Sequence, residues 1–334
     1  MKPLISILLP YKNTVLYLDA CLQSIIDQTY INWELIAIED HATDGSLALV
    51  QSWAAKDARI KTYPNNGKGI IAALRTAYKI STGTHITRMD SDDLMMPTRL
   101  AHMIRSLQKH GKGHLAVGQV KYFSKDGIGN GYLRYQNWLN KLTANGTNFK
   151  ELYKECVIPS PCWMVHRTDL DSAGAFNENR YPEDYDLAFR FYENGLQVIP
   201  CNEILLKWRD YSTRTSRTSE HYAQNYFLDI KVHYFLKLEH QPEKQIAIWG
   251  AGTKGKTIAK LLLEQNISFN WYCNNPKKIG KDIYGVLLKS FTELATFQNI
   301  QLIVTVANEK EQQQVRAYLK QIEDENLVDS FFFC

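Results

Sequence analysis

The chain has 334 residues, of which 45% are hydrophobic and 22% are charged, and its formal net charge is +4. A chain of this length and hydrophobic content buries a sizeable core, and the length predicts two or three domains. Because the lysines and arginines are scattered and form no long basic run, the sequence does not indicate a nucleic-acid-binding protein.

Cysteine usage and hydropathy bear on where the protein works. The six cysteines form no CxxC pair, which argues against a disulfide framework or a zinc site and favours a reducing compartment. The N-terminal apolar run ends at Pro10 and predicts a buried strand rather than a signal peptide. No run approaches the roughly 18–20 apolar residues that cross a bilayer. We expect a cytoplasmic protein, with peripheral attachment to the inner face of a membrane and homo-oligomerisation left open.

The first hundred residues alternate strand and helix patterns. Strands are predicted at Ile5–Leu9, Trp33–Ile38, Arg59–Tyr63 and His85–Met89, with helical segments between them, the last at Gly69–Ile80. This alternation predicts βαβ units and a mostly parallel sheet. In such sheets ligands bind beyond the carboxyl ends of the strands. The polar residues that follow the predicted strands are Asn13, Asp40, Asn65, Asn66 and the run Asp90–Asp93.

Residues 100–215 are less regular. They include one predicted strand, Cys162–His166, and one predicted helix, Glu183–Asn194. The polar segment Ser212–Ser219 lacks periodicity and predicts a loop or a mobile flap. A predicted helix, Glu220–Leu238, rich in aromatic residues that we expect to pack, leads to a boundary near Pro242.

The C-terminal segment predicts a small α/β unit. A strand at Ile246–Trp249 leads into the turn Gly250-x-Gly252-x-x-Gly255 and a helix, the context of a dinucleotide-binding fingerprint. The carboxylate expected about 20 residues further on is missing. Two interpretations stay open: a Rossmann-like domain with a structural, regulatory or oligomerising role, or one that binds a nucleotide or other small ligand near Lys254 and Lys256.

The acidic run Asp90-Ser91-Asp92-Asp93 directly follows a predicted strand. Carboxylates two residues apart can hold a divalent cation that bridges two phosphates, and their oxygen atoms suit Mg²⁺ or Mn²⁺. A solvated turn that caps the helix after Pro97 explains the same residues. Taken alone, the run favours that simpler explanation, because short motifs often match by chance.

Several motifs occur in a fixed order along the chain, namely Ile5–Asn13, Leu22–Leu35, Glu39–Ser46, Asn66–Leu74, Asp90–Leu100 and Gly174–Arg190. In this order they resemble the family 2 inverting glycosyltransferases of the GT-A fold, over residues 4 to about 210. Two places depart from the family pattern. Arg75 stands where an Asn is usual, and Pro159–Pro161 stands where many relatives carry a His.

The resemblance implies a fold and an activity. The fold is α/β, a GT-A type mostly parallel sheet flanked by helices, followed by the small Rossmann-like domain. The activity is transfer of a sugar from a nucleotide-sugar donor, UDP-hexose or UDP-N-acetylhexosamine, to a glycan or lipid-linked acceptor of polysaccharide biosynthesis, with inversion and with Mn²⁺ or Mg²⁺. The predicted domains are residues 1–215 (1–100 for the nucleotide and 101–215 for the acceptor), a bridging helix at 216–242, and residues 243–334.

The resemblance also implies a role for each site residue. Tyr11 and Asn13 flank the base and the ribose, and Asp40 accepts a hydrogen bond from the uracil imide. Asp92 binds the cation together with Asp90, which also contacts the donor. Arg88 either offsets nearby charge or forms a structural ion pair with Asp93 or Glu183. The full donor-binding set is Pro10, Tyr11, Asn13, Asp40, Asn66, Gly69, Arg88 and Asp90.

Asp184 is implied as the general base. An acceptor hydroxyl that attacks the anomeric carbon must lose its proton to a carboxylate within roughly 3 Å. Glu183 and Asp184 also suit a helix start, where the macrodipole favours acidic residues, and both explanations can hold together. On the acceptor side we expect Glu183, Trp208 and Arg209. The alternatives for the last two, with Arg214 and Arg217, are a flap over the diphosphate and a solvated basic loop.

Two other functions stay open. One is an NAD-linked oxidoreductase built on the C-terminal glycine turn. The other is a transferase-like module that binds a nucleotide sugar without turnover, against which the intact set of Asp40, Asp90, Asp92 and Asp184 argues.

Overall fold

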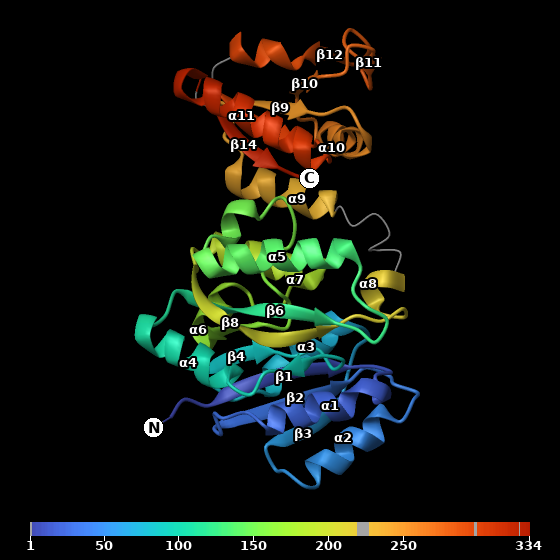
Figure 1. Ribbon diagram of the computed structural model, residues 1–334, viewed down its shortest axis with the longest axis vertical. Coiled ribbons are helices and arrows are strands. Elements are labelled where there is room, and N and C mark those ends of the chain that lie inside the picture. The colour runs from blue at the N-terminus through green and yellow to red at the C-terminus, as the bar shows by residue number, and fades with distance from the viewer. Residues whose placement is uncertain (1, 219–226, 297–298, 327) are drawn as a thin grey trace. The chain divides into compact units, whose positions relative to one another are not determined.

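A computed structural model of the chain describes residues 2–218, 227–296, 299–326 and 328–334 (Figure 1). The chain divides into two compact units, residues 1–150 with 156–218, and residues 151–155 with 219–334. The predicted bridging helix Glu220–Leu238 is described only from residue 227, as α9 (Leu228–Tyr234) and a π-helical turn η3 (Phe235–Glu239) that belong to the second unit. Two of the aromatic residues that we expected to pack in this helix, Tyr222 and Tyr226, lie outside the described residues.

The first half of unit 1 has the predicted alternation of strands and helices. Its elements are β1 (Ile5–Tyr11), α1 (Val15–Ile26), β2 (Trp33–Glu39), α2 (Ser46–Ala54), β3 (Ile60–Pro64), α3 (Ile70–Ile80) and β4 (His85–Arg88). The four strands are parallel and lie in the order β3-β2-β1-β4. Their carboxyl ends therefore meet at one edge of the sheet, as the sequence predicts.

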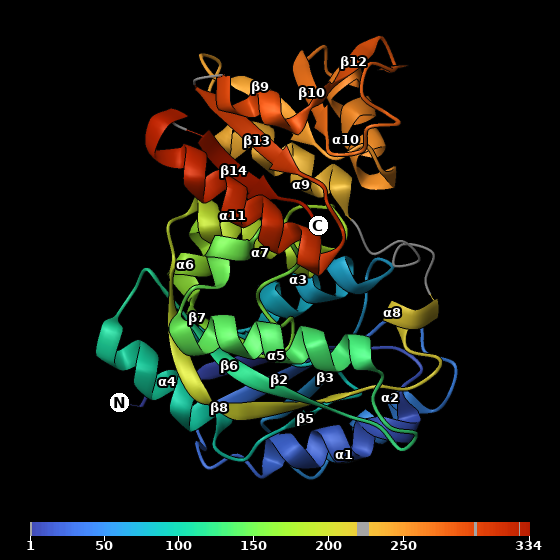
Figure 2. The same ribbon diagram turned by 45° about the horizontal axis from the view of Figure 1, so that its top comes forward.

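The second half of unit 1 extends the same sheet in the order β4-β7-β6-β8-β5. Strand β7 is antiparallel to both of its neighbours, whereas β6 and β8 are parallel to each other. Helix α5 packs along β6 and β8 (Figure 2). The elements are β5 (Leu94–Met95), α4 (Arg99–His110), β6 (His114–Phe123), α5 (Asn130–Asn145), η1 (Asn148–Glu151), β7 (Trp163–His166), α6 (Arg167–Ser172), α7 (Glu183–Glu193), β8 (Gln197–Arg209) and α8 (Thr215–Thr218).

The core of unit 1 covers both faces of the sheet. All seven residues of β1 are buried, as expected of a parallel strand between two layers of helices. Ile5, Ile7 and Leu9 pack in one cluster with residues of α1 and α4 such as Leu22 and Leu100. Each such side chain contributes about 1.5–3 kcal/mol when fully buried. In such sheets ligands bind beyond the carboxyl ends of the strands.

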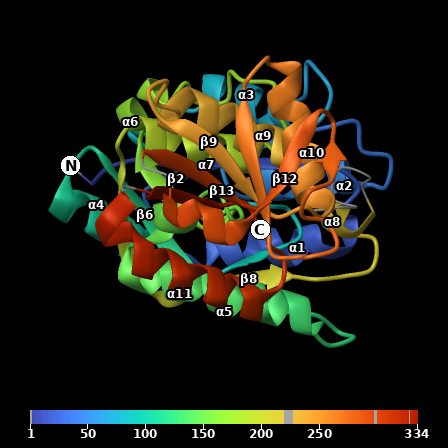
Figure 3. The same cartoon turned by 90° about the horizontal axis from the view of Figure 1, so that it is seen from above.

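Unit 2 holds a second sheet, in the order β11-β12-β10-β9-β13-β14, in which every neighbouring pair except β11–β12 is parallel. Helices α10 and α11 lie on opposite sides of β9 and β13 (Figure 3). The elements are β9 (Gln245–Trp249), α10 (Thr253–Glu264), β10 (Phe269–Cys273), β11 (Asp282–Ile283), β12 (Val286–Ser290), η4 (Phe291–Thr296), β13 (Ile300–Val304), α11 (Glu309–Asn326) and β14 (Val328–Phe332).

The predicted glycine turn joins β9 to α10. Gly250 has a φ of 127°, which side chains rarely adopt, and a Cβ atom on Gly255 would collide with the carbonyl oxygen of Gly250. Close packing of strand against helix therefore accounts for both glycines, and binding of a ligand at this turn stays a prediction. Within the described residues, no helix combines the length and the apolar character needed to span a bilayer.

Candidate active site

Asp40, directly after β2, is held by the segment that joins β3 to α3. Its Oδ1 atom accepts hydrogen bonds from Asn65 Nδ2 at 2.7 Å and from the backbone N–H of Gly69 at 2.9 Å. Both bonds fall on Oδ1, and the Oδ2 atom lies 3.8 Å from Lys12 Nζ. Asp40 is thus a fixed acceptor, 6% exposed, at the edge where the parallel strands end.

The predicted donor-binding residues at the ends of β1 and β3 differ in how far they are exposed. The side chain of Tyr11 is only 2% exposed and bonds to Thr62 on β3, and burial raises its pKa to about 12. Its ring belongs to the core, and the preceding Pro10 is also buried. Asn13, with a φ of 51°, accepts a hydrogen bond from the Thr43 N–H. Asn65 contacts Asp40, whereas the predicted Asn66 is exposed.

Arg88, the last residue of β4, joins two distant parts of the sequence. Its Nε atom lies 2.9 Å from Asp90 Oδ1, and its Nη1 atom lies 2.8 Å from Glu183 Oε1 at the start of α7. Burial opposes the charge of this guanidinium, but Asp90 and Glu183 outweigh that effect and raise its pKa. Both alternatives therefore have a basis in the structure, because Arg88 pairs with Glu183 and also offsets the charge of Asp90.

Asp184 follows Glu183 in the first turn of α7. It is partly exposed, and its Oδ1 accepts a hydrogen bond from the backbone N–H of Tyr185 at 2.8 Å. Desolvation, and next the charge of Glu183, raise the pKa of Asp184 to about 7. A carboxylate with this pKa takes up a proton readily near neutral pH, the property required of a general base.

The acidic run folds into a tight turn whose three carboxylates have different surroundings. Asp90 and Asp92 are partly exposed, whereas Asp93 is fully buried. Asp93 Oδ1 accepts the Arg209 N–H at 2.7 Å, but its Oδ2 atom is buried without a hydrogen-bond partner. Burial, and next the charge of Asp92, raise the pKa of Asp93 well above its usual range. The surroundings of the turn therefore disfavour a negative charge on Asp93.

The chain after β8 packs against this acidic turn. Tyr211 donates a hydrogen bond to Asp92 Oδ2 at 2.8 Å, and Arg209 Nε donates to the Asp92 carbonyl at 2.6 Å. The charges of Asp93 and Asp92 help to raise the pKa of Arg214, against the opposing effect of burial. Trp208 is 7% exposed and stacks on Tyr122 in the core, so its ring is not displayed to a ligand. The sequence did not single out Tyr211, because no local pattern links it to residue 92.

A divalent cation fits the chemistry of the acidic turn. Asp90 and Asp92 offer partly exposed carboxylates two residues apart, and the neighbouring Asp93 has a buried oxygen without a hydrogen-bond partner. Within the described part of the chain, no group of three or more His, Cys, Asp or Glu side chains forms a complete metal site. Mg²⁺ is commonly bound by one or two carboxylates together with substrate phosphates, which is the arrangement that two aspartates permit.

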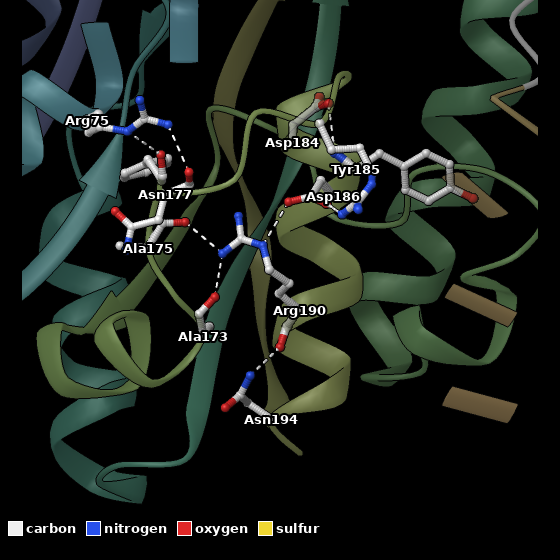
Figure 4. Close-up of polar contacts among 11 residues, drawn as sticks. Arg75, Ala173, Ala175, Asn177, Asp184, Tyr185, Asp186, Arg190 and Asn194 are labelled. Atoms are coloured by element: carbon white, nitrogen blue, oxygen red, sulfur yellow. Dashed lines mark hydrogen bonds and ion pairs between the residues drawn. The ribbon is translucent and has the colours of Figure 1, made fainter. Parts of the chain in front are cut away.

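Two arginines, Arg75 and Arg190, bond to the loop that precedes α7 (Figure 4). Arg190 bonds to Asp186 Oδ2 at 2.8 Å and to the carbonyl oxygens of Ala173 and Ala175. Arg75, the residue that departs from the family pattern, bonds to the same loop from α3. These contacts therefore hold the loop that leads to the first turn of α7, where Glu183 and Asp184 lie.

Sequence relatives and solved structures resemble this chain. The UDP-Glc:alpha-D-GlcNAc-diphosphoundecaprenol beta-1,3-glucosyltransferase WfgD of Escherichia coli is 29% identical over 212 residues, which cover 62% of this chain and 77% of the relative. TarS 1–349 of S. aureus, solved in complex with UDP-GlcNAc, matches with a TM-score of 0.56 at 15% identity over 77% of this chain and 71% of its own.

A second solved structure is the mannosyltransferase PcManGT of Pyrobaculum calidifontis in complex with GDP-Man and Mn²⁺. It matches with a TM-score of 0.51 at 17% identity, over 78% of this chain and 69% of its own. The two structures confirm the predicted α/β fold of the GT-A type. The sequence profile of Glycosyl transferase family 2 matches residues 6–174, and the chain belongs to this family of glycosyltransferases.

Proposed function

We propose that the protein transfers a sugar from a nucleotide-sugar donor, UDP-hexose or UDP-N-acetylhexosamine, to a glycan or lipid-linked acceptor, with inversion at the anomeric carbon. The observation that carries this proposal is the two-sided ion pair of Arg88 with Asp90 and Glu183. It links Asp90, one of the two proposed cation ligands, to Glu183, the neighbour of the proposed base Asp184.

The donor would lie along the edge formed by the ends of β1 to β4. Asp40 is a fixed acceptor there, able to pair with the N–H of a uracil ring. Asp90 and Asp92 would hold Mn²⁺ or Mg²⁺ beside the diphosphate. When bound, this cation would neutralise charge that develops on the leaving diphosphate. Residues 1–100 would thus bind the nucleotide, and residues 101–215 would bind the acceptor.

Asp184 would act as the base. Its carboxylate would accept the proton of the attacking hydroxyl as the hydroxyl displaces the diphosphate from the opposite face of the sugar. Arg88 and Glu183 would fix its position, and the raised pKa of Asp184 gives it affinity for that proton near pH 7. Direct displacement by one carboxylate-assisted hydroxyl inverts the anomeric configuration.

Two comparisons support the choice of donor and acceptor. The name of the Escherichia coli relative gives a UDP-linked glucose donor and a lipid-diphosphate-linked acceptor. TarS was solved with UDP-GlcNAc, and PcManGT with Mn²⁺. These ligands are consistent with the oxygen-rich acidic turn of the present chain.

Donor turnover tests the proposal. The purified protein is incubated with a panel of UDP-sugars and MnCl₂, and release of UDP is measured. Asp184→Asn should lower turnover by about 10²–10⁴-fold, the usual contribution of a general base, and should leave Mn²⁺-dependent UDP binding unchanged in a thermal-shift assay. Asp92→Asn should weaken that binding.

Glu193→Gln, an exposed change at the other end of α7, is the matched control and should behave as the unaltered protein. The proposal fails if no donor releases its nucleotide with any divalent ion. It also fails if Asp184→Asn turns over donor at the unaltered rate.

A further inference from the structure

Arg75 connects helix α3 to the loop that precedes the candidate base. Its Nε atom donates to the Phe176 carbonyl at 3.0 Å, and its Nη2 atom donates to the Asn177 carbonyl and to Asn179 Oδ1, both at 2.9 Å. Figure 4 shows the guanidinium reaching across to this loop. All three acceptors are neutral, and among the described residues no carboxylate pairs with Arg75. The fork shape of the guanidinium, more than its charge, fixes the loop.

The same helix begins at the proposed donor site. The N–H of Gly69, the residue that caps α3, donates to Asp40. Arg75 lies six positions after Gly69, which corresponds to about 9 Å along a helix axis. One short helix therefore contacts the nucleotide-side carboxylate at its first turn and the acceptor-side loop in its second.

The loop is held from its other side by α7 itself. Arg190 donates to the carbonyl oxygens of Ala173 and Ala175, just before the segment that Arg75 holds. Arg180, just after that segment, bonds to Asp186 Oδ1 at 2.9 Å. Of these three arginines, Arg75 is the one that lies in the first hundred residues, on helix α3. Without it, the described contacts of these arginines tie the loop only to α7.

We propose that Arg75 is a positioning residue that fixes the position of α7, the helix that carries the candidate base Asp184, relative to the donor site. This inference rests on the proposed function. Arg75 holds the loop at residues 176–179, so that the start of α7 and Asp184 stand at a fixed place beside the reacting carbon of a donor bound at Asp40 and Asp90. Misplacement of a reacting group by about 1 Å costs on the order of 100-fold in rate, so a loosened loop should lower kcat while donor binding persists.

Three variants of α3 test this role. Arg75→Asn introduces the residue that the family resemblance leads one to expect, and its side chain is too short to reach the loop. Arg75→Lys keeps the charge but offers a single nitrogen in place of the fork. Lys79→Ala, an exposed change one turn further along the same helix, is the control. Thermal unfolding and the stoichiometry of UDP binding report the folded fraction of each variant, so that kcat refers to folded protein.

Donor turnover and hydrogen exchange are measured on the full chain. Arg75→Asn should lower kcat by about 10- to 100-fold with an unchanged KM for the UDP-sugar, and amide exchange should accelerate at residues 176–184 but not at 69–74. Arg75→Lys should fall between this variant and the unaltered protein, and Lys79→Ala should match the unaltered protein.

Unchanged exchange at residues 176–184 in Arg75→Asn would overturn the proposal. So would a kcat within twofold of the unaltered value, or a loss that appears wholly in the donor KM. If the unaltered protein turns over no UDP-sugar, the proposed function is refuted. The exchange rates then still decide whether Arg75 holds the loop.

Discussion

At the residue scale, the raised pKa of Asp184 predicts how activity depends on pH. Burial and Glu183 raise this pKa to about 7, and only the ionised carboxylate accepts a proton. We expect kcat to rise with pH and to reach half of its plateau near pH 7. The measurement is the pH profile of UDP release at saturating donor and Mn²⁺. A profile that is already flat from pH 5 upward would show that another group acts as the base.

The same shift predicts a cost in stability. The pKa of Asp184 lies above its ordinary value of 3.8 in the folded protein, so the folded state binds this proton more tightly than the unfolded state does. Ionisation therefore disfavours folding progressively as pH rises from about 4 to about 7. Asp184→Asn should unfold at a higher urea concentration than the unaltered protein at pH 8, with a smaller difference at pH 5. Equal midpoints at both values would contradict the predicted sign.

Single residues also show how far the sequence predicts the site. Asp40 and Asp90 were predicted correctly to lie at strand ends, because strand periodicity and the parallel order place them there. Asn65 bonds to Asp40, whereas the adjacent Asn66 is exposed, and contact of Asn66 with the donor stays a prediction. The ring of Tyr11 lies in the core, because strand β1 continues to residue 11 and both of its faces are buried.

At the element scale, Glu34 on β2 ties the start of the sheet together. It accepts hydrogen bonds from Ser6 on β1, from the N–H of Thr82 before β4 and from Lys61 on β3. Burial opposes its charge, but these donors outweigh that effect and lower the pKa of Glu34 from 4.5 to about 2. Its contribution to stability is therefore full above about pH 4.5 and is lost as the pH falls toward 2.

Glu34→Gln should destabilise unit 1 by about 1–3 kcal/mol at pH 7, the usual cost of leaving buried hydrogen-bonding groups unsatisfied. The difference from the unaltered protein should shrink as the pH falls from 4.5 toward 2. Urea unfolding at pH 7 and pH 3 measures it. Asp126→Asn, a change at an exposed loop residue, should show no such trend, and a Glu34→Gln effect that grows on acidification would contradict the assignment.

Elements of the second half of unit 1 were harder to predict. Strands β6 and β8 pair with each other over ten residues each but with an irregular register, and their burial does not alternate cleanly. The contact of Tyr211 with Asp92 spans 119 positions in the sequence and follows only from where β8 ends. Long-range pairing of this kind leaves no local period to detect.

At the scale of the whole molecule, two separate cores predict two responses to ligand. The core of unit 1 surrounds its eight-stranded sheet, and unit 2 has a cluster of its own around β9 and β13. All proposed donor and metal contacts come from unit 1. A ligand that binds only the folded form at 100 times its dissociation constant stabilises that form by about 2.7 kcal/mol. In calorimetry, UDP with Mn²⁺ should therefore raise the temperature of one unfolding transition and leave the temperature of a second unchanged.

Asp92→Asn is the control for this experiment, because weakened cation binding should remove the ligand-dependent shift and preserve both transitions. A ligand-dependent shift of both transitions by the same amount would mean that the two units unfold as one body. The ligand could instead raise the temperature of only that transition which Glu34→Gln leaves unchanged. This outcome would indicate that the nucleotide binds unit 2, where the glycine turn of residues 250–255 is the candidate site. That outcome would favour the nucleotide-binding interpretation of the C-terminal unit, because Glu34 contributes to unit 1 alone.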